Sequence, residues 1–194
     1  MDESTTTPVT ARPLTPPARL PVLLGRSEQV TGFVAELTGT VVLGRDLNLD
    51  LALPHEGVSR RHAEVVVAED GTVRARDLGS TNGTLVNGIP IATHELNGGE
   101  LIQVGPVELE FRFVTAAELK HVRQTAEARA RLSTLSARER EVAHLVAQGL
   151  KSNEIAARLH ISVRTVNTHL EHIFERLQVR GRLLLTRLVV EAES

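Results

Sequence analysis

The middle of the chain has the pattern of a series of short β-strands. Short apolar runs alternate with turn signals such as Asp70-Gly71, Asn82-Gly83 and Asn87-Gly88. Residues 107–113 alternate apolar and charged side chains, as a strand does when one of its faces is buried. Many short strands at this spacing predict an all-β sandwich over residues 19–114. The strands expected are 40–43, 63–67, 72–75, 84–86, 101–104 and 107–113.

From residue 135 onward the apolar residues recur with the period of an α-helix. Ser136 and Glu139 have the spacing of a capping box, and Gly149 is typical of a helix C-terminus, so a first helix is expected between them. A second helix is expected over 152–159. The region as a whole predicts a small bundle of helices.

The third helix of this region carries one apolar stripe. Ser162 is its expected N-cap, after a tight turn at 160–161. Two short helices joined by such a turn, the second with a polar outer face, predict a unit that places a helix in the major groove of DNA. The stripe consists of Val166, Leu170, Ile173 and Leu177, and the opposite face carries Arg164, Asn167, Thr168, Glu171 and Glu175.

Composition divides the chain into four segments. Residues 1–18 are rich in threonine and proline and predict a disordered tail. Residues 115–134 contain neither glycine nor proline and predict a mostly helical, solvated linker. Pairing of this linker with its copy in a dimer is a further expectation, against which its weak apolar stripe argues. The change from strand to helix pattern marks a domain boundary. The expected fold class is therefore α+β multidomain, with an all-β sandwich over 19–114 and an all-α bundle over 135–194.

The overall composition excludes several classes of protein. The 194 residues include no cysteine, tryptophan or tyrosine and only four phenylalanines. This argues against disulfides, thiolate metal sites and the aromatic stacking that readers of single strands use. The absence of a leader and of an apolar run of roughly 20 residues predicts a cytoplasmic protein. No cofactor is expected, and His169 with His172 lacks a third metal ligand. At a net charge of −2, a single copy is expected to bind DNA weakly.

Residues 135–182 closely resemble the DNA-binding domain of LuxR-type (GerE-like) regulators. The elements REREV, EIA, TV and RxR occur in the order of that family. The resemblance implies that Asn167, Thr168 and Glu171 contact bases. It implies further that basic residues near the start of the recognition helix hold phosphates together with Thr165, and that the final helix, 183–190, forms a dimer contact. We count Arg164 among the phosphate-binding residues.

Two positions depart from the pattern of the LuxR-type family. Lys151 replaces the usual serine, so the helix cap is expected to shift to Ser152 and Lys151 to face a phosphate. Glu171 stands where relatives are often basic. A carboxylate there accepts from cytosine N4 but repels phosphates, so Glu171 either sets specificity or marks a site with fewer contacts. The alternative is a helical bundle that serves protein contacts, which explains the apolar stripe but not the order of the polar residues.

Three loops of the predicted sandwich carry groups that bind anions. The motifs LGR, VSRRHAEV and DLGSTNGTLVNG occupy 43–45, 58–65 and 77–88. The guanidinium of Arg45 makes paired, charge-assisted hydrogen bonds to a phosphate, and Ser59 and Arg60 add donors. Asn82 is placed to hold a ligand backbone, while Gly79 and Gly83 allow turns with positive φ.

Together these motifs resemble the forkhead-associated (FHA) domain, a β-sandwich that recognises phosphothreonine in proteins. The resemblance implies that Arg45, Ser59 and Arg60 bind the phosphate and that Thr81 and Asn82 grip the peptide. It also implies that Gly44, His62 and Asn87 are structural, with His62 bracing the loop that carries Ser59. Some FHA domains have lost this activity and only bind other proteins.

The two resemblances together predict a bacterial transcription regulator that senses signalling by a Ser/Thr protein kinase and binds DNA as a homodimer. No arrangement of catalytic residues emerges, so an enzyme is not expected. One alternative is an FHA adaptor whose helical domain serves assembly, and another is a constitutive DNA binder that recruits a further factor. Thr5, Thr6 and Thr7 are candidate phosphorylation sites, because a short tether would deliver a phosphorylated tail to the chain's own FHA site. A threonine-rich disordered terminus without this role is the competing interpretation.

Overall fold

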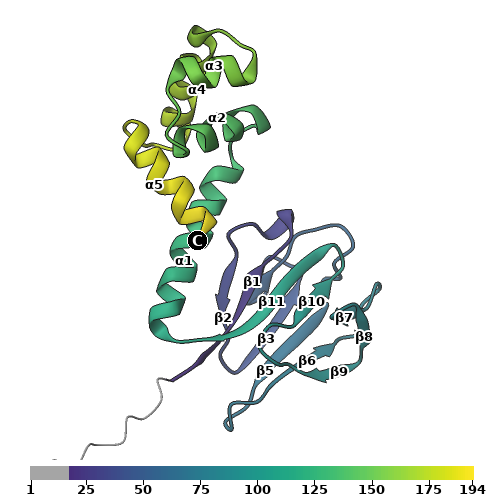
Figure 1. Cartoon of the computed structure of the whole chain (residues 1–194). Helices are drawn as coiled ribbons and strands as arrows, with labels where there is room; N and C mark the ends of the chain where they lie inside the picture. Colours follow the sequence, from purple (N-terminus) through teal and green to yellow (C-terminus); the bar gives the residue numbers. More distant parts are fainter. Residues whose placement is uncertain (1–17) are drawn as a thin grey trace, which may run out of the picture.

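Residues 18–194 are described by a computed structural model, in which a β-domain is followed by a helical domain (Figure 1). The strands form two sheets with the orders β2-β1-β11-β10-β7-β8 and β4-β3-β5-β6-β9. A short 3-10 helix, η1, occupies Glu28–Val30. The strands are β1 (Leu20–Gly25), β2 (Val34–Glu36), β3 (Thr40–Gly44), β4 (Leu51–Ala52), β5 (Ala63–Val67), β6 (Val73–Asp77), β7 (Thr84–Val86), β8 (Ile89–Ile91), β9 (Thr93–Glu95), β10 (Leu101–Val104) and β11 (Val107–Val114).

The core of the β-domain lies between the two sheets. Leu23 on β1 and Phe111 on β11 face each other in register, and both are fully buried. The all-β sandwich is confirmed, and each of the six expected strands occurs, as β3, β5, β6, β7, β10 and β11. The remaining strands are short or lie at sheet edges, except β1, which pairs with both β2 and β11.

The helical domain contains the expected bundle. Its core consists of buried residues, and those that are entirely buried include Val142, Ile155, Val166, Ile173 and Leu185. The helices are α1 (Ala116–Ser133), α2 (Ala137–Ala147), α3 (Ser152–Leu159), α4 (Val163–Arg176) and α5 (Arg182–Glu193).

The ends of α2 and α4 follow the sequence signals. Ser136 and Glu139 form the predicted capping box, in which the Ser136 amide donates to the Glu139 carboxylate at 2.8 Å. Gly149 has φ +87° just beyond α2, a conformation that glycine adopts without strain. The Thr165 amide donates to Ser162 Oγ at 3.0 Å, so Ser162 is the N-cap of α4 as predicted.

The N-cap of α3 was predicted wrongly. Ser152 is the first helical residue, and the cap position is Lys151. The Lys151 amide donates to the carboxylate of Glu154 at 2.6 Å, which satisfies one of the free amides of this helix end without a capping hydroxyl. The Ser152 hydroxyl is therefore available for contacts with other helices.

Helix α1 is less solvated than its composition predicts. Leu119 is buried and Val122 half-buried against the outer face of β1, β2 and β11, where they form an apolar cluster with Val22, Leu24 and Val114. Farther along the same helix, Ala128 and Leu132 belong to the core of the helical domain. The weak apolar stripe is thus used within the chain, and α1 joins both domains.

The η1 loop fits closely against α1. A Cβ atom on Gly32 would lie 2.5 Å from Ala130 Cβ and 2.8 Å from the Ala126 carbonyl oxygen. Arg123 on α1 also forms an ion pair with Glu36 on β2 at 3.4 Å. Helix α1 therefore packs on the β-domain through apolar, backbone and charged contacts.

Strand β11 departs at one position from its predicted alternation. The alternation predicts that Glu110 is exposed, but only 7 % of its surface is accessible to solvent. Its carboxylate binds the guanidinium groups of Arg26 and Arg112, the latter at 2.5 Å. Burial raises the pKa of Glu110, but the hydrogen bonds from Arg112 and Arg26 outweigh it, so the pKa lies below its usual value. The two arginines thus keep a buried carboxylate charged.

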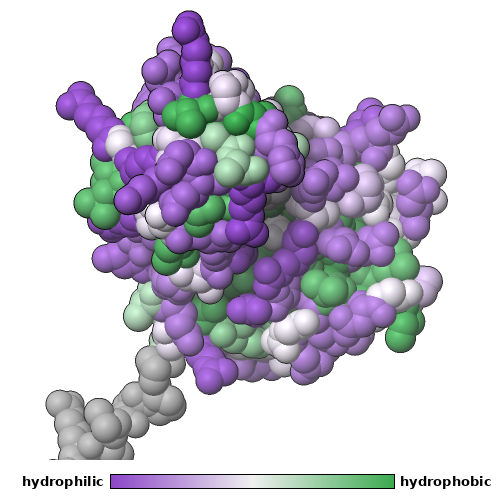
Figure 2. Space-filling model, turned by 45° about the horizontal axis from the view of Figure 1, so that its top comes forward, coloured by the Kyte–Doolittle hydropathy of each residue, from purple (hydrophilic) through white to green (hydrophobic). Residues whose placement is uncertain are grey.

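Within residues 18–194 no helix has both the length and the apolar character needed to cross a bilayer. The helical end is mostly hydrophilic on the face shown in Figure 2, with small separate hydrophobic patches.

Candidate functional site

Three loops at one end of the sandwich carry the candidate phosphopeptide residues. Arg45 follows β3, Ser59 and Arg60 precede β5, and Thr81 and Asn82 lie between β6 and β7. The Arg45 amide donates to the Ser59 carbonyl at 3.0 Å, which joins the first two loops. The Thr81 amide donates to Ser59 Oγ at 3.0 Å, which joins the second loop to the third. The structure therefore brings these loops together.

Gly44 allows the first two loops to approach. A Cβ atom at this position would lie 2.2 Å from the Arg60 carbonyl oxygen, which no side chain could tolerate without displacing the backbone. The Asp46 amide donates to that same carbonyl at 3.3 Å. Glycine at position 44 therefore lets the loop that carries Arg45 lie against the backbone of Arg60. This is the physical reason for the structural role predicted for Gly44.

His62 braces two of the three loops. The side chain is fully buried, and its Nδ1 accepts a hydrogen bond from the Ser59 amide at 3.1 Å. Its Nε2 lies 3.0 Å from the Gly83 carbonyl oxygen. Because Nδ1 accepts, a neutral ring carries its proton on Nε2 and donates it to Gly83. The predicted bracing of the Ser59 loop is present, and it extends to the loop that carries Asn82.

Asp77 organises the third loop from within. Its carboxylate accepts hydrogen bonds from the amides of Gly79 and Ser80 at 2.9 and 3.0 Å. It also accepts from the hydroxyls of Ser80 and Thr84 at 2.6 and 2.7 Å. Burial raises the pKa of Asp77, but the hydrogen bonds from Ser80 and Thr84 outweigh it and bring the pKa below its usual value. Gly79 and Gly83 have φ +73° and +74°, as predicted.

The basic side chains of this end are exposed. Within residues 18–194, Arg45 and Arg60 take part in no ion pair, so their guanidinium groups are available to an anion. Asn82 is also exposed, and its Nδ2 donates to the Gly57 carbonyl at 2.9 Å. Asn82 borders a shallow hollow with Gly57 and Pro106. A peptide that bonded to Arg45 and Asn82 would lie across the ends of the loops.

The candidate DNA-binding residues share one face of the helical domain. Val166, Leu170, Ile173 and Leu177 are buried, as predicted. The residues of the opposite face are exposed, namely Arg164, Thr165, Asn167, Thr168 and Glu171 on α4 and Lys151 before α3. The turn between α3 and α4 is tight because His160 adopts a left-handed conformation with φ +53°. The polar face of α4 is therefore presented to solvent.

A chain of hydrogen bonds fixes the side chain of Asn167. The Ser152 hydroxyl donates to Asn167 Oδ1 at 3.0 Å and accepts from Arg182 Nη2 at 2.8 Å. Arg182 Nη1 donates to the Leu150 carbonyl at 2.8 Å. Because the amide oxygen is held, the Asn167 amide nitrogen and its two donors point away from Ser152. Arg182 closes the RxR element of the sequence, but its link to Asn167 could not be read from the order of residues.

The other polar residues of α4 have simpler surroundings. The Thr168 hydroxyl donates to the Arg164 carbonyl at 3.1 Å, and the Thr165 and Ser162 hydroxyl oxygens are 2.8 Å apart. Lys151 and Glu171 form no ion pair among the residues that the structure describes. A phosphate can therefore reach Lys151, and Glu171 remains an uncompensated carboxylate on the exposed face.

Helix α5 presents apolar side chains to solvent. Leu183 is 82 % exposed and Val190 is 53 % exposed, while Leu185 and Val189 are fully buried. The exposed side chains lie where the sequence predicts a contact between two copies, which stays a prediction. The candidate phosphorylation sites Thr5, Thr6 and Thr7 lie outside the described residues.

Comparison with known proteins identifies both domains. The family described as bacterial regulatory proteins, luxR family, matches residues 133–189, and the FHA domain family matches residues 41–105. The matches occur in the order that the sequence predicts. The chain therefore contains an FHA domain followed by a LuxR-type helix-turn-helix domain, both of which belong to regulatory and binding proteins.

Three curated relatives are similar to parts of this chain. FHA domain-containing protein FhaA of Mycobacterium tuberculosis is 41% identical over 75 residues, which are 38% of this chain and 14% of FhaA. Nitrate/nitrite response regulator protein NarL of Escherichia coli is 33% identical over 92 residues, 47% of this chain and 40% of NarL. Oxoglutarate dehydrogenase inhibitor of Corynebacterium diphtheriae is 40% identical over 72 residues, 37% of this chain and 50% of that protein. This chain thus spans half or less of each relative's length.

Proposed function

We propose that this chain is a transcription regulator that binds DNA through α4 and a phosphothreonine-containing protein through the loops of its FHA domain. The observation that supports the proposal most directly is the exposure of both polar faces in one chain. On the β-domain, Arg45 and Arg60 carry unpaired charges among the described residues. On the helical domain, Asn167 and Thr168 stand on the exposed face of α4.

The phosphate would bind where the three loops meet. Arg45 would donate two parallel hydrogen bonds to the phosphate, and the Ser59 hydroxyl and Arg60 would add further donors. Thr81 and Asn82 would hold the peptide backbone beside it. Because phosphothreonine is the product of a Ser/Thr protein kinase, such a kinase is the upstream partner in this proposal.

The helical domain would read double-stranded DNA in the major groove. Asn167, Thr168 and Glu171 would contact base edges, while Lys151, Arg164 and Thr165 would hold phosphates. With a net charge of −2 on the chain, one copy would neutralise few phosphates and bind weakly. Binding as a homodimer through α5, where Leu183 and Val190 are exposed, would double the contacts.

The tail supplies an additional regulatory element. Thr5, Thr6 and Thr7 precede β1 by fewer than 20 residues. A tether of this length gives an effective concentration on the order of millimolar, so a phosphorylated tail would compete with outside phosphopeptides for Arg45 and Ser59. To test this, an outside phosphopeptide is titrated against kinase-treated full-length and tail-deleted proteins. Equal affinities would exclude closure of the tail.

An adaptor is the second candidate function. The name of the Corynebacterium relative, oxoglutarate dehydrogenase inhibitor, associates that protein with an enzyme rather than with a promoter. In an adaptor the helical domain would serve assembly. A regulator must shift one DNA sequence at moderate salt in preference to random DNA, whereas an adaptor has no such preference.

The decisive experiment couples the two sites. A binding sequence is first obtained by in vitro selection with the full chain, and its affinity is then measured with and without a phosphothreonine peptide. The unphosphorylated peptide and the Arg45→Ala variant are the matched controls. A regulator that senses the phosphoprotein shows a change in DNA affinity that both controls abolish. Specific DNA binding without any change would instead identify a constitutive DNA binder.

A further inference from the structure

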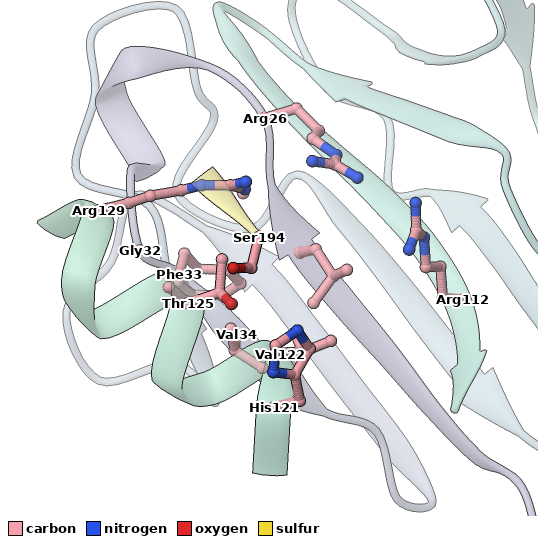
Figure 3. Close-up of a pocket in the computed structure, with 13 residues that line it drawn as sticks. Arg26, Gly32, Phe33, Val34, Arg112, His121, Val122, Thr125, Arg129 and Ser194 are labelled. Atoms are coloured by element: carbon pink, nitrogen blue, oxygen red, sulfur yellow. The ribbon is translucent and has the colours of Figure 1, made fainter. Parts of the chain in front are cut away.

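A second cluster of basic side chains lies away from the three loops, in a pocket between the β-domain and α1 (Figure 3). One wall is the outer face of β1, β2 and β11, and the other is α1. The pocket has a volume of about 240 Å³, roughly the share of liquid volume of eight water molecules. It shares no lining residue with the candidate phosphopeptide site.

The pocket carries an excess of positive charge. Arg26 and Arg112 line it from the β-domain, and Arg129 and His121 line it from α1. Figure 3 shows Arg129 reaching across the pocket toward Arg26. Glu110 is the carboxylate that Arg26 and Arg112 share, and Arg129 forms no ion pair within residues 18–194. Three guanidinium groups therefore line the pocket, two of them share the Glu110 carboxylate, and Ser194 lines the pocket beside them.

Many of the donors on these arginines are unused. Arg112 and Arg129 each bind a protein acceptor through Nε, Arg112 at Glu110 and Arg129 at the Ala192 carbonyl, 2.7 Å away. No hydrogen bond of their terminal nitrogens is found among residues 18–194. Since a guanidinium has five N–H donors in a rigid fork, both side chains are held in place while their ends remain free to bind an oxyanion.

The hydroxyl of Thr125 is a further polar group at this pocket. Thr125 is 8 % exposed and lines the pocket from α1. Within the described part of the chain its hydroxyl makes no hydrogen bond to another protein group. Since no buried side-chain oxygen or nitrogen of the described residues lacks a partner, this hydroxyl is accessible from the pocket and free to donate to a bound molecule. The remaining wall is apolar, with Leu24, Phe33, Val34 and Val122.

We propose that this pocket binds a small organic anion with two negative charges, through Arg26, Arg112, Arg129 and the Thr125 hydroxyl. The charge requirement follows from the surplus of guanidinium groups, and the apolar wall accommodates a short carbon skeleton. Dicarboxylates and phosphate monoesters both have this chemistry. Because Arg112 lies on β11 and Arg129 on α1, the ligand bridges the two walls and holds α1 against the β-domain.

Such a ligand affects the helical domain through α1. The same helix supplies Ala128 and Leu132 to the core of the helical domain. A ligand that binds better when α1 is packed on the β-domain therefore restricts the movement of the DNA-binding domain relative to the FHA domain. The size of this effect is set by the difference between the ligand's affinities for the packed and unpacked arrangements.

The test is a titration of the full chain by calorimetry at constant ionic strength, with succinate, phenyl phosphate and inorganic phosphate as probes. We expect succinate or phenyl phosphate to bind more tightly than inorganic phosphate. Arg112→Ala and Arg129→Ala should each weaken that binding roughly ten- to hundredfold, because each removes charge-assisted hydrogen bonds. Thr125→Val, which keeps shape and charge, should weaken it several-fold. The stronger of the two organic probes identifies the acid group.

Two controls separate this site from others. Arg74→Ala removes an exposed arginine of the second sheet, 55 % exposed, and should change nothing. Arg45→Ala disables the candidate phosphopeptide site and should leave the probes bound. If no probe binds at about 10 mM, or if Arg112→Ala and Arg129→Ala bind as tightly as the native chain, the proposal is wrong. Loss of binding in Arg45→Ala alone would place the probe in the FHA loops and would also overturn it.

Discussion

In the FHA domain the candidate binding residues stand on loops, whereas in the helix-turn-helix domain most of them stand on one helix. A helix places Asn167 and Thr168 on its outer face as soon as Val166 and Leu170 are buried, because its period fixes the angle between them. Loops have no such period. The position of Ser59 depends instead on hydrogen bonds from outside its own segment.

The side chains that hold the loops are themselves unsuited to contact a ligand. His62 is fully buried between the loops of Ser59 and Gly83, and Asp77 is occupied by four hydrogen bonds. A loop site is therefore sensitive to substitution of the buried residues that hold the loops together, even where these do not touch the ligand. A helix site is vulnerable chiefly at the residues that touch the ligand.

Removal of the His62 side chain is expected to have the largest effect. His62→Ala loses two buried hydrogen bonds and leaves a cavity, which should lower the free energy of unfolding of the β-domain by about 3 kcal/mol. Phosphopeptide binding should be lost as well. Urea unfolding followed by NMR on amides of the β-domain measures the first effect, and peptide titration measures the second.

His62→Gln is the matched variant, because an amide side chain keeps one donor and one acceptor. It should retain part of the stability that His62→Ala loses. If His62→Ala bound phosphopeptide as tightly as the native chain, the loops would not depend on this brace, and the contrast with the helical site would disappear.

Loss of the charge at Arg45 should have the next largest effect. Arg45→Ala removes charge-assisted bonds to phosphate worth ~1.5–3 kcal/mol, so phosphopeptide affinity should fall ten- to hundredfold. Stability should stay unchanged, because Arg45 is exposed and forms no ion pair among the described residues. Calorimetric titration of a phosphothreonine peptide checks the affinity, with Arg74→Ala as control. Unaltered affinity would remove Arg45 from the site.

The sequence could predict the burial or capping role of residues whose position follows from the period of a single helix. The stripe from Val166 to Leu177 and the caps Ser136 and Ser162 follow from spacing within one helix, and all are confirmed. The loop residues were found only because Arg45, Ser59 and their neighbours match a known motif.

The features that the sequence missed depend on what packs from elsewhere in the chain. Glu110 fits an alternating strand, and its burial results from Arg26, which lies 84 residues earlier. The docking of α1 needs the outer face of β1 and β11, which no local pattern in residues 116–133 reveals. Ser152 was expected to be a cap, yet its hydroxyl serves Arg182 and Asn167. Each of these contacts is set by tertiary packing rather than by the helix or strand period of the local sequence.

On the helical site, Asn167→Ala tests direct contact with bases. We expect a loss of ~1–3 kcal/mol in affinity for the selected DNA sequence and little change for random DNA, and the same holds for Thr168→Ala. Competition binding with both DNAs measures the difference. Equal losses on the two DNAs would show that Asn167 contacts a phosphate.

Ser152→Ala sharpens this test, because it leaves Asn167 in place but frees its amide oxygen. If the hydrogen bond to Ser152 orients Asn167, Ser152→Ala should lower specific affinity by less than Asn167→Ala does. Combined with Asn167→Ala, it should add nothing further. Additive losses would mean that Ser152 acts independently of Asn167.

A smaller effect is expected from the pH dependence of the β-domain. The pKa of Asp77 is lowered in the folded state, so the stability it contributes is fully present above the pKa of the unfolded chain. That stability is lost as the pH falls through the lowered folded value. Between neutral and acidic pH, the free energy of unfolding should therefore fall more for the native chain than for Asp77→Asn. The same pH dependence of the free energy of unfolding in both proteins would contradict the role assigned to this carboxylate.

The smallest effect is expected at Lys151, and it differs in kind from that at Asn167. Lys151 is exposed before α3 and forms no ion pair among residues 18–194, so its ammonium group can neutralise one phosphate. Lys151→Ala should weaken binding to selected and random DNA equally. It should also reduce the slope of log affinity against log salt by about one contact. Titrations at three salt concentrations measure the slope, and Lys120→Ala, on the exposed face of α1, is the control. A loss confined to the selected sequence would make Lys151 a reader of bases.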